Sequence, residues 1–338
     1  MTRILLAVLA LLVALPAHAQ DDAAAFYKGK TIRLVVGIAV GSGYDVNARL
    51  LARHMAAHIP GHPAIIVENE PGATSMTMTN ALYNNGPFDG TVIGAAFGGM
   101  PTMPLLQPAS AGHADPAKLI WLGNTNKETH VTYVWHTSPV QSLAAVATTP
   151  LIIGTQAPGS SQYDFPLVAD ALFGWKFKVV SGYGSTSKIN LALENGEVQG
   201  TIAAWTTVKT LSSDWLKDKK IKIIAQWALH KDPELAGIPN VYDFAKTDAD
   251  RAALRLAMAR LDIGRPFFLP PGVPADRVAA LRKAFDATMH DRAYLAEAKT
   301  LKIDVDPSTG EELAALIEQV SHTPADVVAR VRKVLARR

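Results

Sequence analysis

Short apolar runs alternate with amphipathic stretches over most of this chain, and this alternation constrains its fold more than any other feature. Ten runs have the length and composition of buried strands: residues 32–37, 64–68, 91–97, 119–122, 130–135, 151–155, 177–181, 198–204, 221–227 and 266–269. Helical patterns lie among them at residues 46–59, 75–83, 164–173, 185–193 and 248–259. Such alternation predicts open α/β sheets whose strands are joined by right-handed crossovers.

The C-terminal third is predicted to be helical. One apolar stripe with helical spacing runs from Val278 to Met289, and another runs from Leu313 to Val320. Thr323-Pro324-Ala325-Asp326 has the pattern of a capping box with proline at the first helical position, which predicts a last helix opening there. Nothing in the sequence resembles a single long linker. If the chain forms two domains, we therefore expect it to cross between them more than once.

The N-terminus has the pattern of a secretory signal, with Arg3, an apolar core at residues 4–15 and the cleavage pattern Ala17-His18-Ala19. We expect residues 1–19 to be removed by cleavage after Ala19 and the mature protein to be exported to the periplasm. The chain has no cysteine, which excludes disulfides, thiolate metal ligands and a lipid anchor on cysteine. The remaining residues, roughly 320, can bury one large core or two smaller ones.

Charge balance and motif content argue against several function classes. The chain has 33 basic and 30 acidic residues and no basic stripe interleaved with aromatics, so we expect no nucleic-acid binding. Gly41-Ser42-Gly43 follows a strand, but Val46 stands where the dinucleotide fingerprint needs glycine or alanine, so no nucleotide cofactor is expected. His54 and His58 are four residues apart without a third ligand, which favours exposed histidines over a metal site. No nucleophile–base pair stands out, so no catalytic residue is predicted.

Loops between strands and helices are the candidate binding elements. Gly41-Ser42-Gly43-Tyr44-Asp45 places backbone amides at a helix N-terminus, where an anion is favoured. Loops at 68–75, 154–161 and 182–187 have the same position and a similar composition. Turn formation and helix capping explain any one of them. Four such loops together favour a shared ligand site, because ligands of open α/β sheets bind beyond the carboxyl ends of strands.

Three side chains of these regions leave alternatives open. Asp45 either contacts a ligand or caps its helix, and we favour the capping role, in which it holds the loop. Tyr44 either lines the ligand site or is an ordinary packed or surface tyrosine. Trp205 follows a strand and precedes two threonines, an arrangement that suits a flat organic acid, but packing in a core or domain seam explains it equally well.

The chain resembles the substrate-binding proteins of tripartite tricarboxylate transporters, the TctC or Bug family, over essentially its whole mature length. The motifs that carry this resemblance occur in order behind the signal segment. They are Val40-Gly41-Ser42-Gly43-Tyr44-Asp45, Glu68-Asn69-Glu70-Pro71-Gly72-Ala73, Pro87-Phe88-Asp89-Gly90, Leu193-Glu194-Asn195-Gly196-Glu197-Val198 and Pro270-Pro271-Gly272-Val273-Pro274.

The resemblance implies a periplasmic-binding-protein-like α/β fold of type II, with two lobes around a ligand cleft. Lobe 1 would contain residues 27–127 and 260–338 and lobe 2 residues 128–259, with crossover strands near 128–136 and 260–269. It implies capture of a small organic carboxylate, without catalysis, and delivery to the large and small membrane subunits of a transporter. The ligand contacts carried over by position are Gly41, Ser42, Gly43, Tyr44, Asp45, Gly72, Ala73, Thr74 and Ser75 in lobe 1, and Ser160, Ser161, Gly184, Ser185 and Trp205 in lobe 2.

This chain departs from the family pattern in the first two motifs. Ser42 stands in place of a glycine, and Thr74 and Ser75 replace a glycine pair. These side chains fill the wall of the implied cleft, which leaves open a ligand other than the better-known di- and tricarboxylates. We expect a monomer. Two alternative functions are a sensory input protein for a membrane kinase and, with less support, an exported hydrolase.

Overall fold

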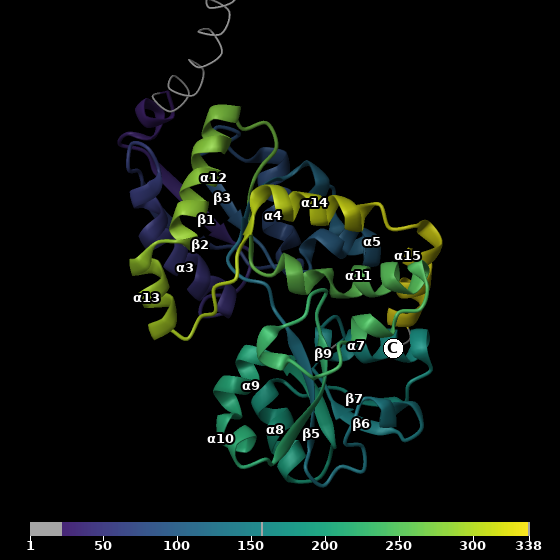
Figure 1. Ribbon diagram of the computed structural model, residues 1–338. Helices are drawn as coiled ribbons and strands as arrows, with labels where there is room; N and C mark the ends of the chain where they lie inside the picture. The colour runs from purple at the N-terminus through teal and green to yellow at the C-terminus, as the bar shows by residue number, and fades with distance from the viewer. Residues whose placement is uncertain (1–21, 157, 337–338) are drawn as a thin grey trace, which may run out of the picture. The chain divides into compact units, whose positions relative to one another are not determined.

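The computed structural model describes residues 22–156 and 158–336 (Figure 1). The predicted signal segment, residues 1–19 with cleavage after Ala19, lies outside the described residues. The chain divides into two compact units. Unit 1 contains the residues up to Pro101 together with Ala109–Asn126 and Arg265–Ile317, and unit 2 contains Thr102–Pro108, Lys127–Gly264 and the residues from Glu318 onward. The chain therefore passes between the units more than once.

Unit 1 contains a six-stranded mixed sheet with the order β11-β4-β10-β3-β1-β2. β1 pairs in parallel with β2 and β3, whereas β10 is antiparallel to β3 and β4, and β11 is antiparallel to β4. Leu34, Val35 and Val36 of β1 are all fully buried, as expected for an inner strand covered on both faces. The strands are β1 (Thr31–Val36), β2 (Ala64–Asn69), β3 (Val92–Ala95), β4 (Ile120–Asn124), β10 (Pro266–Leu269) and β11 (Ser308–Thr309).

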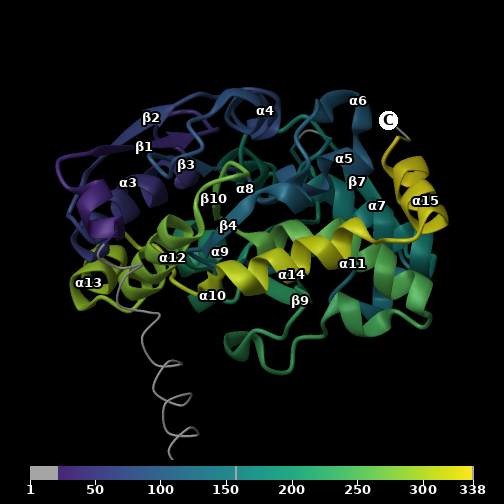
Figure 2. The same cartoon turned by 90° about the horizontal axis from the view of Figure 1, so that it is seen from above.

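The helices of unit 1 bury their apolar stripes against this sheet. Leu50 of α3, Phe285 of α12 and Tyr294 of α13 belong to one buried cluster with β1. Figures 1 and 2 show α12 and α13 side by side within the unit. The helices are α3 (Gly43–Met55), α4 (Met76–Asn85), α12 (Ala275–Met289) and α13 (Arg292–Thr300), while α6 (Pro108–Ala111) and α14 (Gly310–Ser321) each contain a unit boundary.

Unit 2 contains a five-stranded mixed sheet with the order β7-β6-β8-β5-β9. β6 is parallel to β7 and β8, whereas β5 is antiparallel to β8 and β9. Because β5 runs the other way, its first residue, His130, lies opposite Ala204 at the end of β8 and Trp227 at the end of β9. The strands are β5 (His130–Trp135), β6 (Leu151–Gly154), β7 (Phe177–Val180), β8 (Gly200–Ala204) and β9 (Ile221–Trp227).

Helices cover both faces of the unit 2 sheet. Val131 and Tyr133 of β5 belong to a buried cluster with Leu193 of α8. The other face carries Trp227, whose ring stacks on Phe165 of α7 with 5.5 Å between ring centroids. The helices are α5 (Met103–Leu106), α7 (Ser161–Phe173), α8 (Thr186–Glu194), α9 (Trp205–Leu211), α10 (Ser213–Lys217), α11 (Asp248–Ile263) and α15 (Ala325–Leu335).

The last helix groups with unit 2, whereas the family resemblance implied that residues 260–338 belong to lobe 1. α15 contacts α7, α11 and α5, and buries Val327, Val328 and Val331. Its predicted capping box does not form. The helix begins at Ala325 with Pro324 at the N-cap and no side-chain cap, because the hydroxyl of Thr323 instead donates to the Val320 carbonyl of the preceding helix.

The predicted elements are confirmed along most of the chain. The ten strand-like runs overlap β1 to β10, and the five helical patterns overlap α3, α4, α7, α8 and α11. α3 and α7 each begin three residues earlier than predicted, because Ser42 and Ser160 cap them. None of the helices in the described part of the chain combines the length and the apolarity that a membrane crossing requires.

Candidate functional site

The loop between β1 and α3 is closed by its own side chains. Ser42 is the N-cap of α3, and its hydroxyl accepts a hydrogen bond of 3.2 Å from the Asp45 amide. The Gly41 amide donates to Asp45 Oδ2 at 2.8 Å, and Gly41 has a φ of 78°, a conformation that glycine adopts without steric cost. The Asp45 carboxylate therefore lies inside the turn.

Asp45 is 2% exposed and its charge is compensated within unit 1. Its Oδ1 accepts from Arg49 Nε at 3.0 Å and from Asn69 Nδ2 at 2.9 Å. Burial opposes the charged form, but the hydrogen bonds from Arg49, the Gly41 amide and Asn69 outweigh it and lower the pKa of Asp45. The structure thus supports the interpretation that Asp45 holds the loop. Asn69, which sequence reasoning did not select as a site residue, ties the loop to β2 and also donates to the Ile38 carbonyl.

The 72–75 loop holds three successive residues in the left-handed region, Ala73, Thr74 and Ser75, with φ values of 43°, 56° and 72°. Non-glycine residues rarely adopt this conformation, and a β-branched one least readily. Ser75 is fully buried: its hydroxyl donates to the Gly37 carbonyl and accepts from the Phe97 amide. It therefore bridges the residues that follow β1 and β3, whereas Ala73 and Thr74 are exposed.

Tyr44 lies beside the start of α3 with a cation on its ring. Its hydroxyl accepts a hydrogen bond of 3.3 Å from the Gly98 amide, and the Arg265 guanidinium lies 5.6 Å from its ring centroid. A Cβ added to Gly43 would stand 3.3 Å from Arg265 Nη2. The partial positive charge of the helix N-terminus and a guanidinium thus occupy the same region, which favours an anion there.

The loop before α7 in unit 2 follows the same plan as the loop before α3. Ser160 is the N-cap, and its hydroxyl accepts from the Tyr163 amide at 3.3 Å. The Gly159 amide donates to Asp164 Oδ1 at 3.1 Å, and Gly159 has a φ of 90°. Arg260 pairs with Asp164 Oδ2 at 2.8 Å and donates to the Gly159 carbonyl at 2.7 Å. In both loops a serine caps the helix and an acid, paired with arginine, holds a glycine turn.

Gln162 connects two of the predicted unit 2 loops. Its Oε1 accepts from the Gln156 amide at 3.2 Å, and its Nε2 lies 3.4 Å from the Thr186 hydroxyl. Ser185 caps α8 by accepting from the Lys188 amide, and Gly184 precedes it. The structure therefore brings Ser160, Ser161, Gly184 and Ser185 to neighbouring loops at the ends of β6 and β7.

A serine, a histidine and an acid that no sequence motif connects lie in a row beside these loops. Ser161 Oγ is 3.1 Å from His130 Nδ1, and His130 Nε2 is 3.5 Å from Glu128 Oε2. No nucleophile–base pair stood out in the sequence, whereas the structure places the Ser161 hydroxyl within hydrogen-bond distance of His130. Because 31 residues separate His130 from Ser161, no local motif marks the pair, and the only sequence signal was the histidine at the start of a predicted strand.

Trp205 stands next to this row. It is the first residue of α9, and its amide donates to the Thr129 carbonyl at 2.8 Å. Its indole Nε1 donates to Glu234 Oε2 at 2.7 Å, and Lys209 pairs with the same carboxylate oxygen at 2.7 Å. These two hydrogen bonds lower the pKa of Glu234. The indole is half-buried, and its orientation is set by a charged partner.

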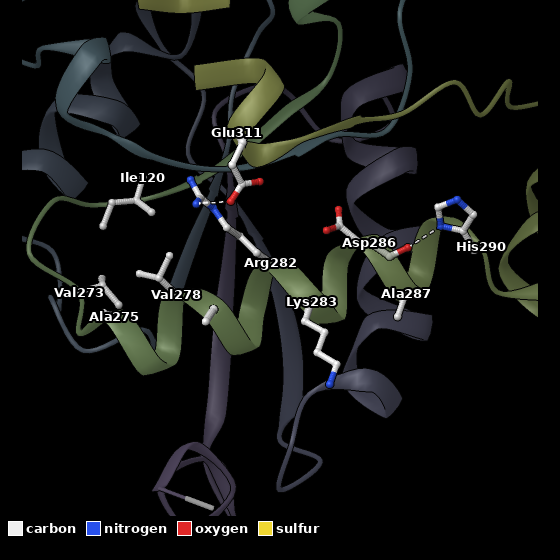
Figure 3. A pocket seen from close by; sticks show the side chains of 11 residues that line it. Ile120, Val273, Ala275, Val278, Arg282, Lys283, Asp286, Ala287, His290 and Glu311 are labelled. Atoms are coloured by element: carbon white, nitrogen blue, oxygen red, sulfur yellow. Dashed lines mark hydrogen bonds and ion pairs between the residues drawn. The ribbon is translucent and has the colours of Figure 1, made fainter. Parts of the chain in front are cut away.

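A separate cavity of about 900 Å³ lies along α12 in unit 1 (Figure 3). Arg282 points across it to Glu311, at 2.6 Å, and also donates to the Trp121 carbonyl, so its guanidinium is engaged within the protein. Burial and the nearby Glu311 raise the pKa of Asp286, which also lines the cavity. Arg282 and Lys283 line the cavity together with Asp286 and Glu311, so acidic and basic side chains balance in its wall.

The two histidines with metal-ligand spacing have carboxylate partners at the N-cap of α13 and within it. His54 Nε2 is 2.7 Å from Glu297 Oε2, and His58 Nε2 is 2.8 Å from Asp291 Oδ2. Their side chains are partly buried by these contacts, so they are not the exposed histidines that the sequence favoured. Within residues 22–156 and 158–336, no three histidine or acidic side chains lie close enough together to hold a metal ion.

Comparison with known proteins gives one short sequence match and several long structural ones. No family model matches the chain. A curated relative, the UPF0065 protein in the gbd 5′ region of Cupriavidus necator, is 38% identical over 76 residues. That match spans only 22% of this chain and 22% of the relative.

Solved structures resemble the chain over about nine tenths of its length. A TctC solute-binding protein from Polaromonas has a TM-score of 0.72 at 19% identity, covering 91% of this chain and 99% of that one. A Rhodopseudomonas palustris protein with adipate has a TM-score of 0.60 at 18% identity, covering 90% and 97%. MatC from the same organism, with bound malate, has a TM-score of 0.58 at 18% identity, covering 90% and 99%. The chain therefore has the α/β fold of TctC-type periplasmic binding proteins.

Proposed function

We propose that the chain is a periplasmic solute-binding protein of the TctC/Bug type, that it captures a small organic carboxylate without catalysis, and that it delivers this acid to the large and small membrane subunits of a tripartite tricarboxylate-type transporter. The fold shared with TctC-type proteins supports the class. The acids bound by two of the compared proteins, adipate and malate, support the chemistry of the ligand.

The observation that carries the proposal is the common plan of the loops before α3 and α7. In each loop the acid is turned inward and paired with arginine, while the serine and the first amides of the helix stand at the helix N-terminus. Turning the carboxylates inward keeps negative charge away from an incoming acid. A carboxylate can then accept hydrogen bonds from backbone amides and hydroxyls.

We propose that each loop, taken by itself, offers contacts to a carboxylate. In unit 1 the contacts are the Gly43 amide and the Ser42 hydroxyl, with Ala73 and Thr74 alongside, and Arg265 adds positive charge at the same helix N-terminus. In unit 2 the contacts come from Ser161 and the half-buried indole of Trp205. Asp45 and Ser75 support the loops from behind, since their polar atoms bond to neighbouring groups of unit 1.

A thermal-shift screen with aliphatic and aromatic mono- and dicarboxylates, including adipate, malate and benzoate, tests this function. An acid at about 100 times its Kd stabilises the folded protein by about 2.7 kcal/mol, which raises Tm by several degrees. We expect at least one acid to do so and matched neutral amides not to. Failure of every acid in the panel to raise Tm would contradict the proposal.

Two variants locate the binding. Gly43→Leu places a side chain in front of the α3 amides and should weaken acid binding more than tenfold with little change in the Tm of the free protein. Ala275→Leu is the matched control, because Ala275 is the first residue of α12, is exposed and lines the cavity of Figure 3. It should leave binding unchanged. The reverse pattern would place the acid in the α12 cavity.

Hydrolysis is a second candidate function, because Ser161, His130 and Glu128 have the order of nucleophile, base and orienting acid. The 3.5 Å separation between His130 and Glu128 is long for a hydrogen bond, which favours recognition over turnover. We expect no hydrolysis of a panel of activated esters above the rate of Ser161→Ala. Turnover that Ser161→Ala abolishes would establish the hydrolase instead.

A further inference from the structure

We propose that His130 and Ser161 form a proton-linked recognition site in unit 2, so that an organic acid binds most tightly when the imidazole is protonated. The inference rests on the proposed function, because it concerns the same captured acid. It adds a residue, His130, that the family motifs in this sequence do not contain. It also adds a property, the uptake of a proton on binding.

The position of His130 suits contact with a ligand held at the strand ends. It is the first residue of β5 and pairs across the sheet with Ala204, which directly precedes Trp205. Its Nδ1 lies 3.1 Å from Ser161 Oγ at the start of α7. The ring is 8% exposed and contacts the Phe165 ring at 6.0 Å between centroids. His130 therefore links two predicted contacts, Ser161 and Trp205.

Protonation of His130 changes what Ser161 can offer a ligand. In the neutral ring, Nε2–H is directed to Glu128 and Nδ1 accepts the hydroxyl proton of Ser161. When the ring is charged, both nitrogens donate, so Ser161 Oγ accepts from Nδ1 and its own proton becomes available. A carboxylate next to Ser161 then gains a hydrogen-bond donor and a nearby positive charge together.

Glu128 is the acid that contacts the His130 imidazole, whereas Asp164 and Asp262 are paired with basic residues. Asp164 of α7 is paired with Arg260 of α11, and Asp262 of α11 pairs with His230 at 3.2 Å. Arg260 also lies 5.6 Å from the centroid of Phe165, the ring that contacts His130. Glu128 is attached to α11 through its amide, which donates to the Leu261 carbonyl at 2.9 Å. Glu128 is therefore a positioning residue, with its carboxylate 3.5 Å from His130 Nε2.

Calorimetric titration of the full chain with adipate, malate and benzoate at about pH 6 and pH 8 tests the inference, because an imidazole changes charge in this range. We expect affinity to be about tenfold higher at the lower pH for the acids that bind. Titration in two buffers of different ionisation enthalpy should show uptake of up to one proton near neutral pH. Benzoate stays ionised across this range, so a pH effect measured with benzoate does not come from titration of the acid itself.

Two variants separate recognition from a structural role. His130→Gln keeps a polar partner for Ser161 and should bind with the same affinity at both pH values, near that of the native protein at pH 8. Glu128→Gln should shift the midpoint of the pH dependence to lower pH, which a purely structural role would not do. Native Tm values for both free variants verify folding.

The outcomes are distinguishable from those that test the proposed function. An acid that binds equally at both pH values without proton uptake overturns this inference and leaves the proposed function standing. A pH dependence that persists in His130→Gln also overturns it. If none of the acids binds at either pH, the proposed function itself fails, and the inference fails with it.

Discussion

At the scale of single residues, Asp45, Asp164 and Asp170 differ in the hydrogen bonds and ion pairs that their carboxylates make. Asp45 and Asp164 are buried, and each is paired with an arginine and a glycine amide, so their charges hold loops in place. Asp170 lies in the last turn of α7, and its carboxylate accepts a hydrogen bond of 3.1 Å from the Phe177 amide. Burial raises the pKa of Asp170 to about 7, and this hydrogen bond offsets only part of that effect. The C-terminal end of a helix also disfavours negative charge.

Replacing Asp170 tests this assignment. Its pKa in the folded state lies above the value of about 3.9 in an unfolded chain, so the folded state holds more protons between about pH 4 and pH 7 and loses stability as pH rises through that window. Asp170→Asn removes this loss and keeps an oxygen for the Phe177 amide. We expect the variant to be more stable by about 1 kcal/mol at pH 8, allowing for solvent screening of a partly exposed group.

Thermal unfolding at about pH 4 and pH 8 measures the effect, which corresponds to about 2–4 °C in Tm at the higher pH. The stabilisation should be absent at the lower pH, where the native carboxyl is already protonated. Asp218→Asn, at an exposed acid of the same unit, is the control and should change Tm little at either pH. Equal effects of Asp170→Asn at both pH values would show that the charge of Asp170 is not the cause.

At the scale of elements, the 72–75 loop has a costly backbone, because three successive residues that are not glycine lie in the left-handed region. Its three left-handed residues persist because the Ser75 hydroxyl joins the Gly37 carbonyl to the Phe97 amide. The absence of a side chain at Gly37 allows this approach, since a Cβ there would lie 2.6 Å from Ser75 Cβ. Strain of this kind is commonly stored in loops that contact ligands.

Thr74 offers a direct test of the strain. Thr74→Gly should raise the free energy of unfolding by about 1 kcal/mol, because glycine adopts a φ of 56° without the penalty that a β-branched residue incurs. Ala81→Gly, at an exposed interior position of α4, is the matched control and should lower that energy by about 1 kcal/mol. Urea denaturation measures both. A loss of stability in both variants would mean that the loop is unstrained.

At the scale of the whole molecule, the arrangement of strands and helices follows from sequence pattern, whereas the contacts within the site do not. The ten strand runs were predictable because a short run of apolar, β-branched residues bounded by turn residues favours a strand whatever the rest of the chain contributes. The roles of Asn69, Gln162 and Arg260 were not, because each side chain meets partners that only the sheet topology brings near. Ser161 and His130, 31 residues apart, are the clearest case.

The course of the C-terminus was harder to predict than its secondary structure. The apolar stripe of α15 was recognisable from its spacing, but a stripe does not identify the surface that it covers. Val327, Val328 and Val331 are buried in a helix that contacts α7 and α11, so α15 belongs to unit 2. A capping-box pattern likewise does not show whether the hydroxyl of Thr323 will find a nearer acceptor, as it does in the Val320 carbonyl.

A crystal structure with the tightest-binding acid of the screen is the most direct test of the central claim, that a loop of this plan binds a carboxylate at its helix N-terminus. We expect a carboxylate oxygen within hydrogen-bond distance of the Gly43 amide or the Ser42 hydroxyl of unit 1, or of the Ser161 hydroxyl of unit 2. An acid that touches neither loop, or that occupies the cavity along α12, would contradict the claim.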